Sequence, residues 1–298
     1  MLDNFYKDKR VLVTGGAGFI GSHLAEKLVN LGALVCVLDN LSTGNIENIR
    51  PFADKLNFIE GSVTDLDACL AAAHNCNIVF HLAAEVSVAE SQKNPYPALT
   101  TNTQGTLNVA QAAHLSGVKM LVFASSAAVY GNHEGLCSEE LTPAPVSTYG
   151  HSKLFGEHIM QLYAQLHGLP TVSMRFFNVH GPRQNYNNGT GGVLAVFEKK
   201  LKGNEPLAIF GDGTQTRDFV PVSTIVESLL RAGMFNKEIC NGQAFNIGTG
   251  RSISLNQKLA ELLQKFPDYN QEITYLDPRP GDIKHSACDC SKFQKAVI

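Results

Sequence analysis

The chain has 298 residues, with 24 Lys and Arg against 27 Asp and Glu, and a formal net charge of −3. This length allows one large domain, or a large domain with a smaller partner, and the 44% hydrophobic content excludes a mainly disordered chain. The near-neutral charge argues against nucleic-acid binding through broad phosphate neutralisation. No apolar run is long enough for a membrane-spanning helix, and the polar first residues lack the apolar core of a secretion signal.

Seven cysteines are scattered along the chain without a CxxC pair. This pattern supports neither a zinc site nor a disulfide framework. The ten histidines show no HExxH or HxH spacing, so we expect no bound metal. Reduced thiols are typical of cytosolic proteins, and we therefore expect a cytoplasmic location.

Apolar runs alternate with helix-like stretches in the first half of the chain. We expect strands at 11–14, 34–38, 56–59, 77–81, 120–124 and 171–175, and helices at 20–31, 99–116 and 149–167. Continuous apolar strands separated by helices indicate a parallel sheet covered on both faces. The sequence therefore predicts an α/β fold with a doubly wound, Rossmann-type parallel sheet.

This alternation ends after Arg175, where short segments and clustered Gly, Asn and Pro replace it. Residues 221–235 have the pattern of a helix and 244–247 that of a strand, and both are expected to return to the sheet. The expected division is a larger domain at 1–178 with return segments at about 218–248, and a smaller, interleaved C-terminal substrate lobe at 179–217 and 249–298.

A glycine-rich turn follows the first strand, because Gly15, Gly18 and Gly21 form a GxxGxxG pattern that opens a helix. Such a turn lets the backbone approach a pyrophosphate at a helix N-terminus, where free N–H groups favour anions. Asp39 ends the second strand, at the spacing where a carboxylate binds the ribose hydroxyls of a dinucleotide and repels a 2′-phosphate. No arginine follows immediately to accept that phosphate. We therefore predict NAD as the cofactor of the larger domain.

Tyr149 and Lys153 are four residues apart and share one face of a predicted helix. A nearby cation favours phenolate and can lower a tyrosine pKa of about 10 toward working pH. Tyr149 is therefore a candidate general base, and Lys153 a candidate for tuning it and binding a ribose. This spacing is common by chance. The segment 124–131 (ASSAAVYG) supports the interpretation because it ends the fifth strand, at the sheet edge where α/β proteins bind ligands.

Several further motifs, in order along nearly the whole chain, belong to one family. They include TGGAGFIGSHL, HLAAEVSV, FASSAAVYG, YGHSK, RFFNVHGPRQ and RPGDIKHS. The sequence resembles the extended short-chain dehydrogenase/reductases, specifically the NAD-dependent nucleotide-sugar epimerase/dehydratase family. The resemblance implies that Ser126 hydrogen-bonds the sugar 4-hydroxyl, that Tyr149 takes its proton with Lys153 beside it, and that NAD takes the C4 hydride.

The resemblance also implies which residues contact the ligands. Cofactor contacts are implied at Gly15, Gly18, Phe19, Ile20, Gly21, Asp39, Asn40, Ser62, Val63, Ala83, Ala84, Asn102, Tyr149 and Lys153. Substrate contacts are implied at Ser87, Ser126, Tyr149, Asn178, Val193, Arg217, Arg279, Asp282 and Ser286, with the two arginines on the diphosphate. Ser62 departs from the family pattern, since many members have an Asp there that contacts adenine. From the residues alone, Arg217 could instead pair with Asp218.

Positions 127 and 128 distinguish the reactions known in the family. Dehydratases and decarboxylases place acidic residues after the catalytic hydroxyl, whereas this chain has Ala127 and Ala128, which cannot move a proton. The resemblance thus implies a 4-epimerase, in which the sugar is oxidised at C4 to a 4-keto form, turns, and is reduced again. The expected substrate is a UDP-sugar: UDP-GlcNAc/UDP-GalNAc, UDP-Glc/UDP-Gal, or both.

Two small residues concern the choice among these sugars. Ser87 lies where members that use N-acetylhexosamines have a sugar-contacting Ser, and Ser286 replaces a bulky Tyr of members restricted to plain hexoses. A UDP-glucuronate 4-epimerase, a dehydratase, a decarboxylase, a reductase and a non-catalytic NAD-binding protein stay open as alternatives. The resemblance further implies a homodimer formed by the helices at 99–116 and 149–167.

Overall fold

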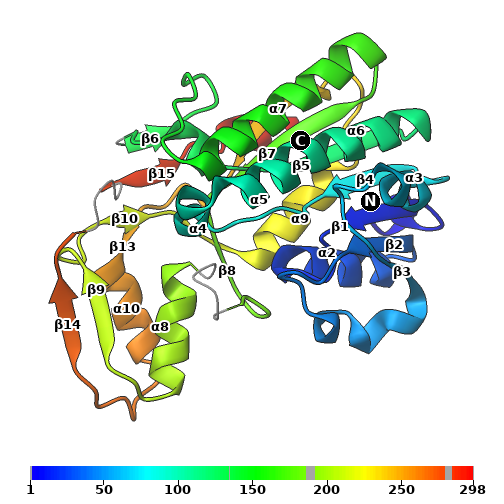
Figure 1. Cartoon of the computed structure of the whole chain (residues 1–298). Helices are drawn as coiled ribbons and strands as arrows, with labels where there is room; N and C mark the ends of the chain where they lie inside the picture. Colours follow the sequence, from blue (N-terminus) through cyan, green and yellow to red (C-terminus); the bar gives the residue numbers. More distant parts are fainter. Residues whose placement is uncertain (1, 134, 186–191, 279–283, 298) are drawn as a thin grey trace.

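The computed structural model describes residues 2–133, 135–185, 192–278 and 284–297. Within these residues, seven parallel strands form the central sheet in the order β12–β7–β5–β4–β1–β2–β3 (Figure 1). Their bounds are β1 (Arg10–Thr14), β2 (Leu34–Asp39), β3 (Leu56–Glu60), β4 (Ile78–His81), β5 (Met120–Ser126), β7 (Thr171–Phe176) and β12 (Asn241–Ile247). The predicted α/β class with a doubly wound parallel sheet is confirmed.

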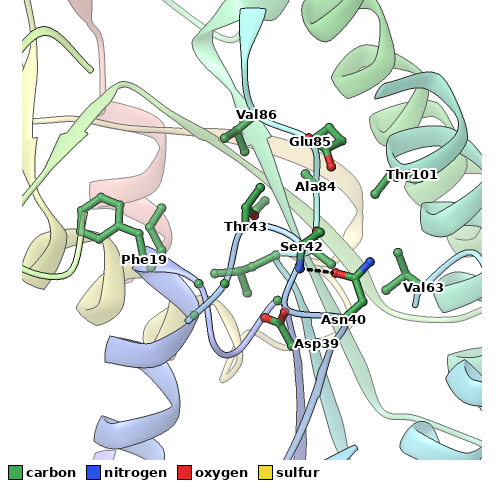
Figure 2. Close-up of a pocket in the computed structure, with 18 of the residues that line it drawn as sticks. Phe19, Asp39, Asn40, Ser42, Thr43, Val63, Ala84, Glu85, Val86 and Thr101 are labelled. Atoms are coloured by element: carbon green, nitrogen blue, oxygen red, sulfur yellow. Dashed lines mark hydrogen bonds between the residues drawn. The ribbon is translucent and has the colours of Figure 1, made fainter. Parts of the chain in front are cut away.

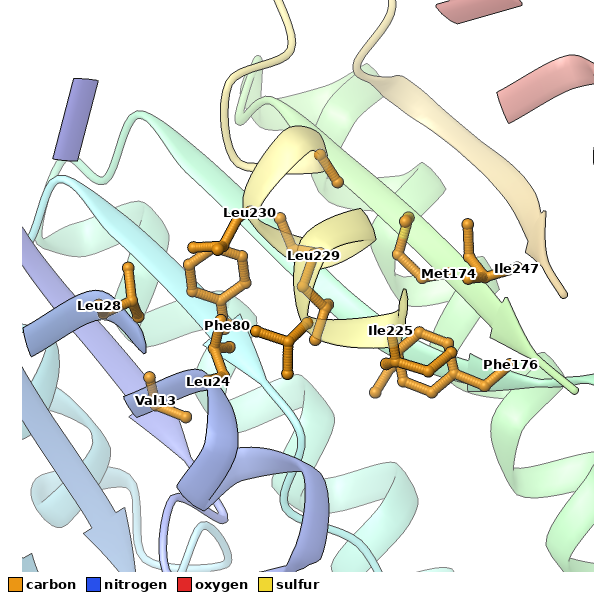
Figure 3. Packing of buried hydrophobic residues seen from close by; sticks show 14 of the residues in the cluster. Val13, Leu24, Leu28, Phe80, Met174, Phe176, Ile225, Leu229, Leu230 and Ile247 are labelled. Atoms are coloured by element: carbon orange, nitrogen blue, oxygen red, sulfur yellow. The ribbon is translucent and has the colours of Figure 1, made fainter. Parts of the chain in front are cut away.

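Helices cover both faces of this sheet. One face carries α2 (Phe19–Asn30) and α9 (Val222–Ala232), and the other carries α3 (Leu66–Ala73), α6 (Gly105–Leu115) and α7 (Thr148–His167). Figure 3 shows the first face, where Leu24 and Leu28 of α2 and Leu229 and Leu230 of α9 pack around Phe80 of β4. All five side chains are fully buried, and each such burial stabilises the fold by about 2 kcal/mol. The apolar stripe of α9 thus explains why a helix this late in the sequence returns to the sheet.

The remaining elements near the sheet are short. They are α1 (Leu2–Tyr6), η1 (Ile46–Asn48), η2 (Arg50–Lys55), α4 (Val88–Lys93), α5 (Pro95–Leu99), the π-helical turn η3 (Thr100–Gln104), η4 (Ala127–Tyr130), β6 (Gly135–Cys137), β8 (Asn178–His180), β11 (Phe219–Pro221), β15 (Ser286–Cys288) and α11 (Ser291–Ala296). The helices α5 and α6 and the turn η3 follow one another directly, which the sequence predicts as a single helix at 99–116.

A smaller group of elements has its own hydrophobic core. It consists of α8 (Val193–Lys202), β9 (Leu207–Phe210), β10 (Thr216–Arg217), β13 (Ile253–Ser254), α10 (Leu255–Leu263) and β14 (Ile273–Leu276). At the end of the chain, Phe293 of α11 packs against Phe235 and Phe245 at the large sheet. Strand β15 pairs with β6, beside the large sheet, while His285 bridges to Thr216 of β10. The segment 284–297 therefore contacts both groups of elements.

The strand order reverses at β1, whose two neighbours are β2 and β4. The connections on either side of such a switch point run in opposite directions, which opens a crevice at the carboxyl ends of the strands. The segments after β1, β2, β4 and β5 meet at this edge. No helix among the described residues is long and apolar enough to cross a membrane.

Candidate active site

The turn between β1 and α2 provides an anion-binding site. Gly15 has a φ of +69°, and a Cβ on it would lie 2.7 Å from the backbone nitrogen of Ala83, so a larger residue does not fit. Gly18 is the N-cap residue of α2, and no side chain among the described residues accepts a capping hydrogen bond from the first N–H groups of the helix. The first turn also contains no acidic residue. The first N–H groups of α2 and the positive end of its dipole are therefore available to a phosphate.

Asp39 lies at the end of β2, beside this turn. Its Oδ2 accepts a hydrogen bond from the Ala17 backbone (2.9 Å) and its Oδ1 accepts one from the Leu41 backbone (2.8 Å). Burial raises the pKa of this carboxyl, and the two backbone hydrogen bonds act in the opposite direction. Each oxygen keeps a second lone pair, so the carboxylate can also accept hydrogen bonds from two ribose hydroxyls.

A single cavity joins the turn, Asp39 and the carboxyl ends of β4 and β5 (Figure 2). The sequence-predicted cofactor residues that line it are Gly15, Gly18, Phe19, Ile20, Gly21, Asp39, Asn40, Ser62, Val63, Ala83, Ala84, Tyr149 and Lys153. A glycine cradle, an open helix N-terminus and a carboxylate in one cavity are the donors and acceptors that a dinucleotide requires. The residues present therefore fit NAD.

Two of the three predicted catalytic residues, Tyr149 and Lys153, line the far end of this cavity, and Ser126 adjoins them. Ser126 ends β5 and Tyr149 lies in the first turn of α7, with the Ser126 hydroxyl close enough to lower the Tyr149 pKa. The ammonium of Lys153 donates to the backbone oxygen of Ala124 (2.8 Å) and lies 5.8 Å from the centre of the Tyr149 ring. Ser147 caps α7 by accepting a hydrogen bond from the Gly150 backbone (3.0 Å), which fixes where the helix starts.

Burial shifts the pKa values of both Tyr149 and Lys153. Burial raises the pKa of Tyr149, and the hydrogen bond with Ser126 lowers it by less. Burial also lowers the pKa of Lys153 to about 7. Burial thus disfavours the ionised forms of both side chains, so the phenolate and the ammonium form most readily as a pair.

Asn102 is the predicted cofactor residue that the structure does not bring to the cavity. It is buried in η3, and its amide donates to the Glu85 backbone oxygen (2.9 Å) and to the Ser152 hydroxyl (2.9 Å). Its side-chain oxygen accepts from the Glu85 backbone nitrogen (2.8 Å). Asn102 thus holds the segment after β4 against α7, while the neighbouring Thr101 lines the cavity.

The predicted substrate residues are more scattered. Ser87 caps α4, Asn178 is exposed at the start of β8, and Val193 starts α8. Arg217 in β10 and Ser286 in β15 lie near each other, because Thr216 forms a bridge with His285. Arg279 and Asp282 lie outside the described residues.

The cavity also contains residues that no sequence motif indicates. They are Leu38, Ser42, Thr43, Gly44, Gly61, Leu82, Glu85, Val86, Thr101, Ala124, Ser125, Phe176, Val179, Gln184 and Asn185. Several of them follow predicted strands directly, and this position could have indicated them. Gln184 and Asn185 carry no such signal, since the loop after β8 reaches the cavity through tertiary contacts.

Two contacts attach this loop to α2. His23 of α2 contacts the backbone oxygen of Pro182 (2.9 Å), and Arg183 forms an ion pair with Glu26 of α2 (2.6 Å).

Comparisons with known proteins agree with this geometry. Residues 11–248 match the NAD dependent epimerase/dehydratase family. The chain is 36% identical to a UDP-glucose 4-epimerase of Mycolicibacterium smegmatis, over 97% of this chain and 92% of that protein. The structure is similar to a UDP-N-acetylglucosamine 4-epimerase from Methanobrevibacter ruminantium in complex with UDP-N-acetylmuramic acid, with a TM-score of 0.91, 33% identity and coverage of 98% and 92%.

A second solved structure bears on the cofactor. It is a UDP-glucose 4-epimerase of Thermus thermophilus in complex with NAD, with a TM-score of 0.87, 34% identity and coverage of 96% of this chain and 92% of that one. The family match spans most of the chain and agrees with the dinucleotide cavity described above. The chain therefore belongs to the NAD-dependent epimerase/dehydratase family and is an epimerase with NAD as its cofactor.

Proposed function

We propose that this protein is a UDP-sugar 4-epimerase that interconverts UDP-GlcNAc and UDP-GalNAc, UDP-Glc and UDP-Gal, or both pairs. The observation that carries the proposal is the position of Tyr149 and Lys153 at the end of the NAD cavity, with the Ser126 hydroxyl beside Tyr149. Ala127 and Ala128 follow Ser126 and offer no group for a second proton transfer. Chemistry confined to C4 of the sugar fits this set of residues best.

Each residue of the group has a distinct part in the proposed reaction. Ser126 orients the sugar 4-hydroxyl, and Tyr149 removes its proton and later returns one to the same oxygen. When bound, NAD supplies the acceptor and then the donor of the hydride at C4, so that the sugar passes through a 4-keto form. Since burial raises the pKa of Tyr149, ionisation of this phenol requires a positive charge close to it. Lys153 can provide this charge while it remains protonated.

The nucleotide must be held while the sugar turns. We propose that residues 179–217 and 249–278 form the substrate lobe that provides this grip, with Arg217 on the diphosphate and Asn178 and Val193 toward the substrate. A guanidinium suits the diphosphate because it can donate two parallel hydrogen bonds. Arg279 and Asp282 complete the proposed set, outside the described residues.

Substrate choice within this class rests on two small side chains. We propose that Ser87 and Ser286 leave room for an N-acetyl group at C2 of the sugar. The relatives named above include a UDP-N-acetylglucosamine and a UDP-glucose 4-epimerase, in agreement with either sugar. A comparison of kcat/KM for UDP-GlcNAc and UDP-Glc tests this part, and a strong preference for plain hexoses would contradict it.

The reaction itself is tested by a product assay. Purified protein is incubated with UDP-GlcNAc or UDP-Glc without added reductant, and the products are separated by chromatography and identified by NMR. We expect a C4 epimer of unchanged mass, whereas a loss of water or carbon dioxide would indicate a dehydratase or decarboxylase. Tyr149→Phe should lower kcat by at least about 100-fold, because the proton acceptor is gone. The matched control is Tyr96→Phe, which removes a hydroxyl from a 77% exposed tyrosine.

We also propose that two copies of the chain form a homodimer through α5, α6 and α7. Phe155, Leu162 and Leu166 of α7 are 50%, 45% and 70% exposed, while Ile159 and Tyr163 of the same stripe are buried. Exposed apolar groups gathered on adjacent helices are typical of an interface. We expect Leu166→Glu to yield a monomer in light scattering. Leu276→Glu, a control on the 46% exposed Leu276 of β14, should remain dimeric.

A further inference from the structure

Three consecutive residues at the end of β5 each contact one residue of α7. The Ala124 backbone oxygen accepts a hydrogen bond from Lys153, and the Ser126 hydroxyl lies beside Tyr149 and lowers its pKa. Between them, the Ser125 hydroxyl donates to Oε1 of Glu157 (2.5 Å). Residues 149, 153 and 157 are spaced by four and share one helix face. Three side-chain contacts thus join β5 to α7, and two of them involve the proposed catalytic residues.

The third contact, between Ser125 and Glu157, is supported by a buried ion pair of Glu157 with Arg175. Arg175 donates from Nε to Oε1 of Glu157 (2.9 Å) and from Nη2 to Oε2 (2.7 Å). Arg175 of β7 is also the register partner of Ser125 in β5. Glu157 and Ser125 are 2% and 3% exposed, so water does not compete for these bonds. A bidentate pair in a dry site fixes the carboxylate in position and orientation.

The arrangement continues away from the cavity. Nη1 of Arg175 donates to the Tyr130 hydroxyl (2.8 Å), which in turn donates to Oδ1 of Asn246 (2.7 Å). Asn246 of β12 donates to the backbone oxygen of Cys137 (3.0 Å) in β6. The guanidinium is therefore hydrogen-bonded to buried groups on both sides. Because it cannot move easily, it holds Glu157, and with it α7, in one position.

The helix also lies unusually close to the strand. A Cβ on Gly156 of α7 would lie 2.4 Å from the ring of Phe123 in β5, so glycine is needed for this approach. At such a separation, a small rotation or slide of α7 changes the distance between Tyr149 and Ser126. Misplacing a reacting group by about 1 Å can cost about 100-fold in rate.

We propose that Ser125, Glu157 and Arg175 form a positioning network that sets the distance between Tyr149 and Ser126. Ser125 lines the cofactor cavity, but its hydroxyl donates to Glu157, and neither Glu157 nor Arg175 lines the cavity. Through the Ser125–Glu157 hydrogen bond, they prevent α7 from sliding along β5 or rotating about its own axis. This inference rests on the proposed function, in which Ser126, Tyr149 and Lys153 are the catalytic groups.

Ser125→Ala is the variant that tests the network. It removes the bond between β5 and α7 but leaves Glu157 with both hydrogen bonds from Arg175, so the ion pair and the fold remain. The matched control is Ser173→Ala. Ser173 is fully buried in β7, and its hydroxyl has no hydrogen-bond partner among the described residues. Both variants remove one buried hydroxyl, and only the first removes a positioning contact.

Two readouts are measured on the NAD-loaded proteins. The first is the kcat and KM for the better of UDP-GlcNAc and UDP-Glc. We expect kcat of Ser125→Ala to fall by about tenfold or more while KM stays within about threefold, since the contact acts on the catalytic geometry. Ser173→Ala should match the wild type in both. Ser125→Thr keeps the hydroxyl and should recover most of kcat.

The second readout does not depend on turnover. In protein labelled with ¹³Cζ-tyrosine, the Tyr149 signal is identified by its absence in Tyr149→Phe. We expect this signal to shift in Ser125→Ala, because the distance between Tyr149 and Ser126 changes, and to stay in place in Ser173→Ala. An unshifted signal in Ser125→Ala overturns the inference, whatever happens to kcat, and so does a shifted signal with unchanged kcat. A shifted signal in a protein whose wild type turns over neither sugar refutes the proposed function and leaves the positioning role standing.

Discussion

Gly21 of α2 is the position at which a single methyl group should damage the cofactor site most. A Cβ there would lie 2.1 Å from the Gly15 backbone oxygen, 2.8 Å from its carbonyl carbon and 2.9 Å from Cα of Gly16. Ordinary contact distances start near 3.4 Å. All three atoms belong to the backbone of the phosphate-binding turn, so no side chain can swing away. Gly21→Ala must therefore push the first turn of α2 and the glycine turn apart by about 1 Å.

The cost falls on NAD binding more than on helix formation. Alanine favours a helix over glycine by about 1 kcal/mol, which works against any loss of stability. Separating the turn from the helix misaligns the N–H groups that meet the pyrophosphate, and each hydrogen bond to a charged group contributes about 1.5–3 kcal/mol. The loss of one or two of them amounts to about 3 kcal/mol, or about 100-fold in Kd.

Isothermal titration of NAD into protein freed of cofactor measures this directly. The control is Gly203→Ala, where the nearest atom to the new Cβ is Oε1 of Glu205 at 2.9 Å, the end of an exposed and flexible side chain. We expect the control to bind NAD like the wild type. If Gly21→Ala is folded and its Kd lies within about threefold of the wild type, the assignment of this turn as the pyrophosphate site is refuted.

Two further predictions concern charge. Burial lowers the pKa of Lys153 to about 7, whereas an unfolded chain holds this proton up to about pH 10.4. Between these values the unfolded chain binds more protons than the folded one, so the free energy of unfolding should rise with pH. We expect the urea midpoint of the wild type to rise from about pH 7 to about pH 9.5, and that of Lys153→Met to rise less. The ion pair of Arg183 with Glu26 (2.6 Å) holds the loop that carries Gln184 into the cavity. Partly exposed ion pairs stabilise a structure by up to about 1 kcal/mol, so Glu26→Gln should speed NAD release by up to about fivefold in stopped-flow displacement. The control Glu227→Gln breaks an exposed pair elsewhere and should leave the rate of NAD release unchanged.

The sheet and the cofactor turn could be predicted because their signals are local. The strand from Val11 to Thr14 is an apolar run, the glycines follow it directly, and Asp39 ends the next run. Parallel strands place all such strand ends at one edge, so sequence order alone brings these groups together. The structure confirms the doubly wound sheet, and the cavity along its edge contains the predicted glycines and Asp39.

Contacts between distant segments could not be predicted in this way. The motif that contains Asn102 implies a cofactor contact, but a motif does not say which neighbour an amide binds. Two hydrogen bonds with Glu85 use the Asn102 side chain behind the cavity wall. The pKa shifts of Tyr149 and Lys153 could not be predicted either, because spacing gives the distance between two groups and not their hydration. Burial decides their pKa values, and burial is a property of the whole fold.

Helix α7 shows most clearly how periodicity leaves such questions open. Its residues at 149, 153 and 157 face β5, whereas those at 155, 162 and 166 lie on the exposed surface. A helical repeat of 3.6 residues assigns residues to faces, but a tyrosine, a lysine and a glutamate on one face have the composition of a solvent-exposed stripe. Its partners on β5 and β7, distant in sequence, and the buried Ile159 and Met160 of the same helix hold this polar face against the sheet. The apolar residues on the opposite face then need a different cover, and this is why we propose a second copy of the chain there.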